Sequence, residues 1–209
     1  MLVIIVGMAS EAKIAARLHH LIGIGGGTTA GATQAAQRLI DKGATAVLSF
    51  GIAGGLDPAL PPGTLINPTE ILDGPIRYQT TPALIPWAPA PARIIAGSDT
   101  PLATATAKQR LYAKTTAAAV DMESHAVARI AAAHNLPFAV IRAIADPATT
   151  TLPPAALIPL INGSPNLPRI LASLVENPTQ LPQLLRLAIH AHRAHTALRQ
   201  ALPFPTKTS

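Results

Sequence analysis

Short apolar runs alternate with alanine-rich stretches through the first 146 residues of the chain. The apolar runs are rich in valine and isoleucine, which is typical of buried β-strands. They predict strands at residues 2–6, 21–27, 44–55, 93–97, 117–120 and 136–146, and a strand followed by a loop within residues 63–78. Apolar residues at helical spacing predict helices at residues 10–20, 28–43, 100–114 and 122–135, the first of them with Ser10 as its N-cap.

Strands that alternate with helices predict a sheet that is covered by helices on both faces. We therefore expect an α/β fold, a three-layer αβα sandwich with a central mixed sheet. Ligands of such proteins bind at the carboxyl ends of the strands. The residues that follow each predicted strand are therefore the first candidates for a functional site.

The pattern changes after Pro147, where a loop-like stretch precedes two further predicted helices at residues 168–177 and 182–202. From residue 166 to residue 209 a single acid, Glu176, stands against five basic residues: Arg169, Arg186, Arg193, Arg199 and Lys207. We expect residues 166–209 to form a C-terminal helical extension. It would pack on a single domain that spans residues 1–209, because the chain is short for two domains.

Composition excludes several classes of protein. The chain has no cysteine, which excludes disulfides and thiolate metal sites. His190, His192 and His195 have a spacing that is poor for a shared ion, so we expect no metal. The N-terminal apolar run is too short for a signal peptide, and no run is long enough to span a membrane. We therefore expect a cytoplasmic protein.

The charge is positive, with 16 Lys and Arg against 10 Asp and Glu and a formal net charge of +6. Such a balance is typical of proteins that bind nucleic acid, anionic lipid or an anionic substrate. Nucleic-acid-binding proteins usually cluster their basic residues and place aromatic residues among them. Here the basic residues are spread along the chain and aromatic residues make up 3% of it, so we expect no nucleic-acid partner.

Three of the ten acids, Glu11, Glu123 and Asp146, follow predicted strands. Burying a carboxylate among apolar residues is costly unless the group is paired or used, and burial raises its pKa toward the range of acid–base catalysis. Structural interpretations also exist. Glu11 favours a helix N-terminus, and Glu123 falls in the first turn of a helix that Asp121 can cap. Asp146 precedes a proline, which is a common turn signal.

Five motifs occur in a fixed order: M-x-x-E (8–11), S-F-G-I-A-G-G-L (49–56), P-G-T (62–64), V-D-M-E-S (120–124) and R-A-I-A-D (142–146). Their order and spacing resemble the purine nucleoside phosphorylase and uridine phosphorylase superfamily, over about residues 1–150. Within it, the chain is most similar to the methylthioadenosine/S-adenosylhomocysteine nucleosidase branch. Its length, F-G-I-A-G-G-L-D-P and its C-terminal extension resemble the hopanoid-associated phosphorylases, which are proposed to remove adenine from adenosylhopane.

The resemblance implies an enzyme that cleaves the N-ribosidic bond of an adenine nucleoside, with three catalytic residues. It gives Asp146 the role of protonating purine N7, Glu123 that of binding the ribose hydroxyls, and Glu11 that of activating water. A carboxyl group that is shielded from water could supply that proton near neutral pH. The implied substrate-binding residues are Ala53, Gly54, Asp121 and Met122.

The nucleophile stays open between phosphate and water. Many phosphorylases of the superfamily have an arginine in a G-D-P-x-R pattern, where this chain has G-M-A-S-E. A phosphate could instead bind the N–H groups of Gly25, Gly26 and Gly27 at a helix start, helped by Thr28 or by an arginine. Candidate arginines are Arg77, Arg93 and Arg142. Glu11 would repel a phosphate dianion. We expect no cofactor, with inorganic phosphate as the alternative co-substrate.

The implied partner is a small-molecule or lipid-linked adenine nucleoside, and the superfamily implies a homodimer. A lipid substrate would bring the C-terminal basic helix, or the Pro-rich loop around Trp87, to a membrane surface. Two alternatives to this function stay open, and a third is disfavoured. One is a methylthioadenosine/S-adenosylhomocysteine nucleosidase, and another is a non-enzymatic, basic membrane-binding protein. A dinucleotide-binding oxidoreductase is disfavoured, because Thr28 stands where G-x-G-x-x-G requires its third glycine.

Overall fold

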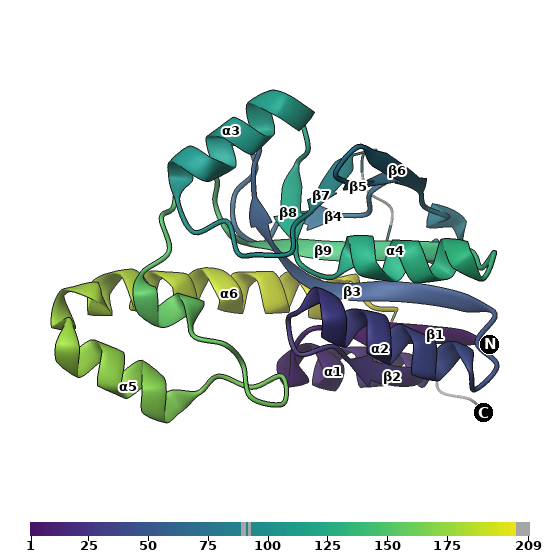
Figure 1. The fold of residues 1–209 in the computed structure, drawn as a ribbon, viewed down its shortest axis with the longest axis horizontal. Helices are drawn as coiled ribbons and strands as arrows, with labels where there is room; N and C mark the ends of the chain where they lie inside the picture. The colour runs from purple at the N-terminus through teal and green to yellow at the C-terminus, as the bar shows by residue number, and fades with distance from the viewer. Residues whose placement is uncertain (89–90, 92, 204–209) are drawn as a thin grey trace.

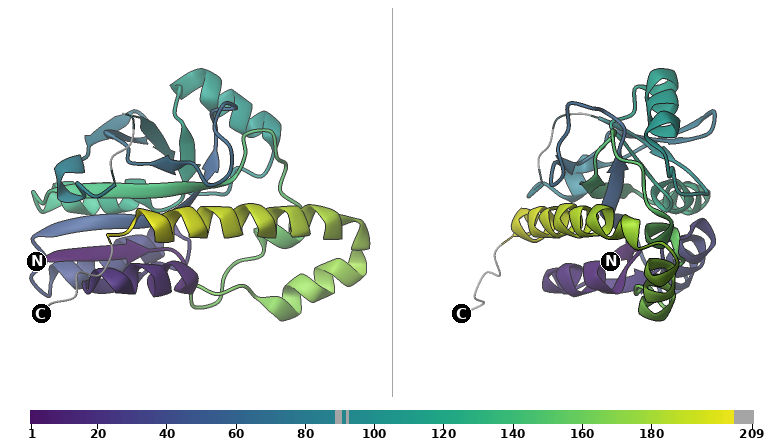
Figure 2. Two further views of the ribbon diagram at one scale, coloured as in Figure 1. Left: turned by 180° about the vertical axis from the view of Figure 1, so that it is seen from behind. Right: turned by 90° about the vertical axis from the view of Figure 1, so that its left-hand side faces the viewer.

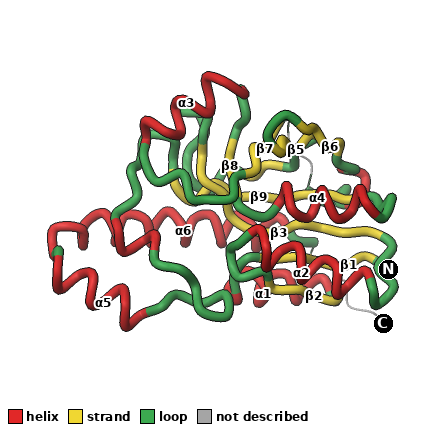
Figure 3. Tube along the Cα trace, viewed as in Figure 1, coloured by secondary structure: helices red, strands yellow, loops and turns green. Residues whose placement is uncertain are grey.

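The computed structural model describes residues 1–88, 91 and 93–203. Part of the Pro-rich stretch (residues 89, 90 and 92) and Lys207 of the basic extension lie outside the described residues. Over the described part, nine strands form one mixed sheet with helices on both faces (Figure 1). The predicted α/β sandwich is confirmed, and Figure 3 shows the alternation of strands and helices along the trace.

The sheet has the order β2-β1-β3-β8-β7-β5-β6, and β9 pairs with both β3 and β4. Its strands are β1 (Leu2–Val6), β2 (Leu21–Ile24), β3 (Ala46–Gly55), β4 (Leu65–Ile66), β5 (Glu70–Asp73), β6 (Ile76–Gln79), β7 (Ile94–Gly97), β8 (Ala119–Asp121) and β9 (Phe138–Asp146). Strands β1, β2, β3 and β9 are parallel neighbours. Strand β8 runs antiparallel to β3. The carboxyl ends of β1, β3 and β9 therefore lie at one edge.

Helices α2 (Thr29–Ile40) and α4 (Ser124–Ala133) cover one face of the sheet, while α1 (Ala9–Ala15) and α6 (Leu181–Ala201) cover the other. The first pair lies in front in Figure 1, and α6 lies in front in the reverse view of Figure 2. Two further helices, α3 (Ala105–Thr115) and α5 (Leu167–Glu176), complete the set of α-helices in the described part. In that part, no helix has both the length and the apolar character needed to cross a bilayer.

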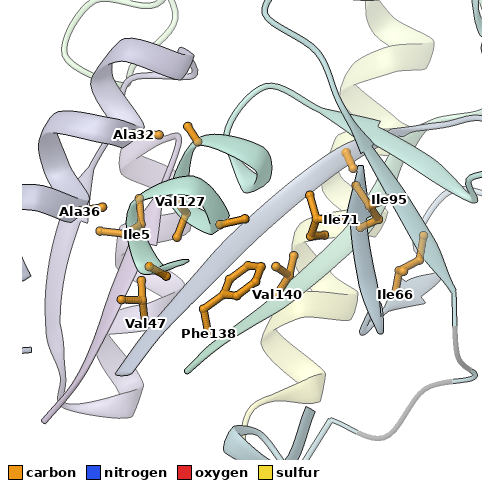
Figure 4. Close-up of a cluster of buried hydrophobic side chains, with 14 of the residues drawn as sticks. Ile5, Ala32, Ala36, Val47, Ile66, Ile71, Ile95, Val127, Phe138 and Val140 are labelled. Carbon is orange, nitrogen blue, oxygen red and sulfur yellow. The ribbon is translucent and has the colours of Figure 1, made fainter. Parts of the chain in front are cut away.

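Each face of the sheet has its own apolar core, as the two-residue period of a strand requires. On β1, Val3 and Ile5 belong to the core under α2 and α4, which Figure 4 shows in part. Ile4 and Val6 belong to the opposite core, together with residues of α1 and α6. The continuous apolar run at residues 2–6 therefore reflects a strand that is buried on both faces.

The structure corrects the predicted start of the first helix. Ser10 is not its N-cap: Met8 occupies that position and Ser10 lies inside the first turn. The reason is that the Glu11 carboxylate accepts hydrogen bonds from the N–H groups of Gly7 and Met8. Those bonds begin the helix earlier than a serine cap would.

Two other predictions were incomplete. Residues 63–78 contain more than one strand, because β5 and β6 form a hairpin whose turn has Gly74 at φ 59°. The helix expected from residue 100 begins at Ala105, where the Thr104 side chain accepts a hydrogen bond from the N–H of Ala107.

Candidate functional site

A cavity of about 220 Å³ lies at the edge of the sheet where β1, β3 and β9 end. All three predicted catalytic carboxylates line it: Glu11, Glu123 and Asp146. The four predicted substrate-binding residues line it as well: Ala53, Gly54, Asp121 and Met122. Residues far apart in the chain therefore meet around a single hollow.

Glu11 is buried and held from three directions by backbone N–H groups. Its Oε2 accepts from Gly7 at 2.9 Å and from Met8 at 2.8 Å. Its Oε1 accepts from Ile52, on β3, at 2.8 Å. Burial raises the pKa of Glu11, while the charge of Arg142 and the three N–H groups oppose that rise. A carboxylate has about four acceptor positions, so one position on Oε1 remains for a further donor.

Glu123 lies between the loops that follow β1 and β2. Its Oε1 accepts a hydrogen bond from the N–H of Gly27 at 3.2 Å. Burial raises the pKa of Glu123 to about 8, and the negative charges of Glu11 and Asp121 add to the rise, against the opposing charge of Arg142. At neutral pH the side chain is therefore mostly protonated, and it can donate as well as accept a hydrogen bond.

Asp146 ends β9 at the opposite side of the cavity and is paired with Lys108 of α3. Burial raises the pKa of Asp146, and the ammonium group of Lys108 opposes the rise. The pairing between β3 and β9 shifts register between Ala53 and Gly54, so that Gly54 pairs with Asp146. Such irregularities often re-aim a side chain next to an active site.

Beneath the carboxylates, Arg142 forms a buried ion pair with Asp121. Its Nε donates to the Asp121 carboxylate at 2.5 Å, and its Nη2 donates to the Ser49 hydroxyl at 2.8 Å. Burial alone would raise the pKa of Asp121, but the charge of Arg142 and hydrogen bonds from residues 123 and 124 hold it below its usual value. Arg142 thus supports the floor of the site and keeps Asp121 ionised.

Glycines make room for the carboxylates. A Cβ at Gly51 would lie 2.5 Å from Oε1 of Glu11, and one at Gly7 would lie 2.6 Å from Oε2 of Glu123. A Cβ at Gly54 would lie 3.4 Å from the Asp146 oxygens, in ordinary contact. Because no real Cβ approaches an oxygen as closely as the first two values require, side chains at those positions would displace the carboxyl groups of Glu11 and Glu123.

The residues expected to bind phosphate lie only partly at the cavity. Gly27 lines the cavity, but Gly25 and Gly26 do not, and the N–H of Gly27 already donates to Glu123. The Thr28 hydroxyl caps α2 by accepting from the N–H of Gly31. None of the three candidate arginines is among the described residues that line the cavity. Arg77 pairs with Glu70 and Arg93 pairs with Asp57. Arg142 pairs with Asp121 beneath the cavity.

The sequence analysis missed Lys108 and the apolar end of the cavity. Lys108 is 1% exposed and is the one cationic side chain among the described residues that line the cavity. Apolar side chains from two loops complete the lining: Pro101, Leu102, Leu152 and Leu160. The sequence contained one indication that Lys108 is buried. Leu111 and Tyr112 follow it by three and four residues, which places all three on the same, inner face of the helix.

No curated protein matches the sequence. The fold is similar to that of the 5'-methylthioadenosine/S-adenosylhomocysteine nucleosidase of Helicobacter pylori, with a TM-score of 0.68, 18% identity and 96% of each chain covered. It is similar to the futalosine hydrolase of Helicobacter pylori, with a TM-score of 0.65, 18% identity and 96% of each chain covered.

The S-adenosylhomocysteine nucleosidase of Streptococcus pyogenes is also similar, with a TM-score of 0.64, 15% identity and 97% of each chain covered. At these identities the likeness concerns the fold. The sequence profile of the phosphorylase superfamily matches residues 3–93 and 86–158, a range that contains all three carboxylates. The assignment to hopanoid-associated phosphorylases stays a prediction, whereas the broader resemblance is confirmed: the chain belongs to the phosphorylase superfamily.

Proposed function

We propose that the chain hydrolyses the N-ribosidic bond of an adenine nucleoside. The observation that carries this proposal is the meeting of Glu11, Glu123 and Asp146 around one cavity whose cationic side chain is already paired. The expectation of an enzyme that cleaves N-glycosidic bonds agrees with the family. A Helicobacter pylori nucleosidase mutant of the same fold, 17% identical and with a TM-score of 0.67, holds 5'-methylthioadenosine in its active site.

Asp146 is proposed to protonate the leaving base. When the bond between C1' and N9 breaks, its electron pair moves into the purine ring, and a proton on N7 turns the base into a neutral leaving group. A shielded carboxylic acid can supply that proton. Ala53 and Gly54 flank Asp146 with little side-chain bulk, which supports a base stacked against β3 at this end.

Glu123 is proposed to bind the ribose hydroxyls, with Met122 packed on the sugar. As the bond breaks, positive charge develops on the ribose ring, and a nearby carboxylate stabilises that charge. Positive charge close to Glu123 also favours its ionised form. Formation of the cation beside Glu123 would therefore lower its pKa from about 8.

Glu11 is proposed to orient and deprotonate the attacking water. Three of its four acceptor positions are filled by backbone N–H groups, and the last one can accept a hydrogen bond from a single water. The water oxygen adds to C1', and its proton passes to Glu11. The products are adenine and the free ribose derivative, so atoms and charge balance.

Water is favoured over phosphate by the electrostatics of the cavity. The negative charges of Glu11 and Asp121 both raise the pKa of Glu123, so the three acidic groups lie close enough to affect one another. The ammonium group of Lys108 is committed to Asp146. A phosphate dianion at this end of the cavity would face the Glu11 carboxylate without a free cation, and like charges repel each other.

The 5' substituent of the nucleoside is proposed to be a large apolar group, with adenosylhopane as the substrate that the sequence resemblance suggests. The apolar lining includes Leu152 and Leu160, and the chain continues at once to Ile161, which is 55% exposed. We expect kcat/KM for adenosylhopane to exceed that for methylthioadenosine by at least about tenfold, because one or two buried methylenes already give that factor. Equal values measured by adenine release would contradict the lipid substrate.

The helical extension is proposed to bind an anionic membrane surface from the cytoplasm. Six apolar side chains recur at four-residue spacing along α5 and α6 and are exposed by 46–83%: Leu167, Leu171, Val175, Leu181, Leu185 and Ile189. Helix α5 and the N-terminal part of α6 lie together at one end of the molecule (Figures 1 and 2). Arg186 and Arg193 lie beside the apolar stripe of α6, which is the pattern of an interfacial helix.

We expect the protein to co-sediment with vesicles that contain phosphatidylglycerol. The double substitution L185S/I189S should weaken binding at least about tenfold, because each apolar side chain contributes roughly 1.5–3 kcal/mol when buried. Ile76→Ser is the matched control, since Ile76 is 51% exposed on β6. Absence of sedimentation at low salt would contradict this surface. The homodimer implied by the superfamily is a separate proposal, which light scattering tests.

A further inference from the structure

Lys108 is the most completely buried charged side chain at the base end of the cavity. It reaches inward from α3 and is 1% exposed. Its ammonium group donates to the Asp146 carboxylate, to the carbonyl of Pro147 at 3.1 Å and to the carbonyl of Thr150 at 3.1 Å. An ammonium group has three N–H donors, so all of them are used.

Two of the three contacts of Lys108 stabilise the structure, and the third bears on the reaction. The two carbonyls belong to the loop after β9, which Lys108 ties to α3. The third contact is with the acid itself. Because no donor remains free, Lys108 does not bind substrate directly and acts on the reaction through Asp146.

We propose that Lys108 is the positioning residue of the general acid: it holds the Asp146 carboxyl group in place and stabilises the carboxylate that remains after the proton has left. The inference rests on the proposed function. Asp146 enters the reaction as a carboxylic acid, its proton moves to N7 of the leaving base, and the resulting carboxylate faces the ammonium group. Lys108 keeps its own protons throughout.

The charges around Asp146 support this role. Burial raises the pKa of Asp146 and so makes it a weaker acid, while the charge of Lys108 opposes that effect. His190 of α6 also faces Asp146. Burial lowers the pKa of His190, and the charges of Arg193 and Arg186 lower it further, so this imidazole is neutral at pH 7. Lys108 is therefore the permanent positive charge that favours proton release.

The test compares Lys108→Met with Lys108→Arg, which keeps the charge. The carboxyl carbon of Asp146 is followed by ¹³C NMR titration and assigned by its absence from Asp146→Asn. We expect the pKa of Asp146 to rise in Lys108→Met, because the neighbouring charge is lost, and to stay near the wild-type value in Lys108→Arg. In Lys108→Met, kcat at pH 7 should fall about tenfold, less than when the acid itself is removed.

The pH dependence of activity is a second measurement, which would not change if Lys108 only stabilised the structure. Activity falls as pH rises through the pKa of Asp146, because the protonated acid is the active form, and Lys108→Met should shift this limb to higher pH. His190→Gln should leave the limb in place. An unchanged pKa and limb in Lys108→Met would overturn the inference. If Lys108→Met does not fold, Lys108→Gln is compared in its place, with the same two outcomes. Failure of the proposed function would appear separately, as a wild-type protein that releases no adenine.

Discussion

Asp146→Asn is expected to lower kcat for adenine release by about 10²–10⁴-fold, the usual contribution of general acid catalysis. The amide has the shape of the carboxyl group but supplies no acidic proton to N7. The substitution also replaces the carboxyl group that accepts a hydrogen bond from the buried ammonium group of Lys108, and it removes the carboxylate that can balance this charge. We therefore expect some loss of stability as well, which is measured by thermal unfolding followed with circular dichroism.

Asp57→Asn is the matched control for Asp146→Asn. Asp57 follows β3 and pairs with Arg93 at 3.4 Å, outside the cavity. This variant also loses an ion pair, yet it should retain nearly wild-type kcat. If Asp146→Asn were folded and as active as Asp57→Asn, Asp146 would not be the general acid.

Glu11→Ala is expected to lower kcat by about 10²–10⁴-fold, because the attacking water loses the group that orients it and takes its proton. Three backbone N–H groups also lose their acceptor. We expect the free energy of unfolding to fall by about 1–3 kcal/mol for that reason. Activity is measured with and without added formate, since a small carboxylate can occupy the vacated space and act as the base.

Partial recovery of Glu11→Ala activity by formate would show that Glu11 acts in catalysis and does not only stabilise the structure. Asn67→Ala serves as the stability control: Asn67 is buried away from the cavity and donates to the carbonyl of Ala88. It should lose stability without losing kcat. A Glu11→Ala variant that is as active as Asn67→Ala would show that the carboxylate only connects the first loop to β3.

The edge of the sheet at which the site lies was predictable, because β1, β3 and β9 are parallel and their ends meet there. That rule accounts for Glu11 and Asp146. It does not account for Glu123, since β8 runs antiparallel to β3 and its end would ordinarily lie elsewhere. The register pairs Val120 with Gly54 and thereby brings Glu123 into the cavity. Apolar runs contain no information about strand direction. Glu123 was a candidate because it follows a predicted strand, and only the family resemblance gave a reason to place it with the other two acids.

Lys108 illustrates what a single sequence leaves hidden. A lysine on an amphipathic helix is usually exposed, and its partner Asp146 lies 38 residues further along the chain. The same holds for two glycines beside the cavity. Gly51 and Gly7 are needed because carboxylates from distant segments lie against them. Such requirements arise from packing between segments, and for Lys108 the local trace in the sequence is its spacing to Leu111 and Tyr112.

The most direct measurement is product analysis of the purified protein with methylthioadenosine and adenosylhopane, in phosphate-free buffer and in buffer with phosphate. If Glu11, Glu123 and Asp146 together catalyse hydrolysis of an adenine nucleoside, adenine and the free ribose derivative will form in equal amounts. Their rate of formation will be the same in both buffers. A strict requirement for phosphate, with the sugar recovered as its 1-phosphate, would contradict water activation by Glu11. Absence of adenine from both nucleosides would contradict the proposed cleavage itself.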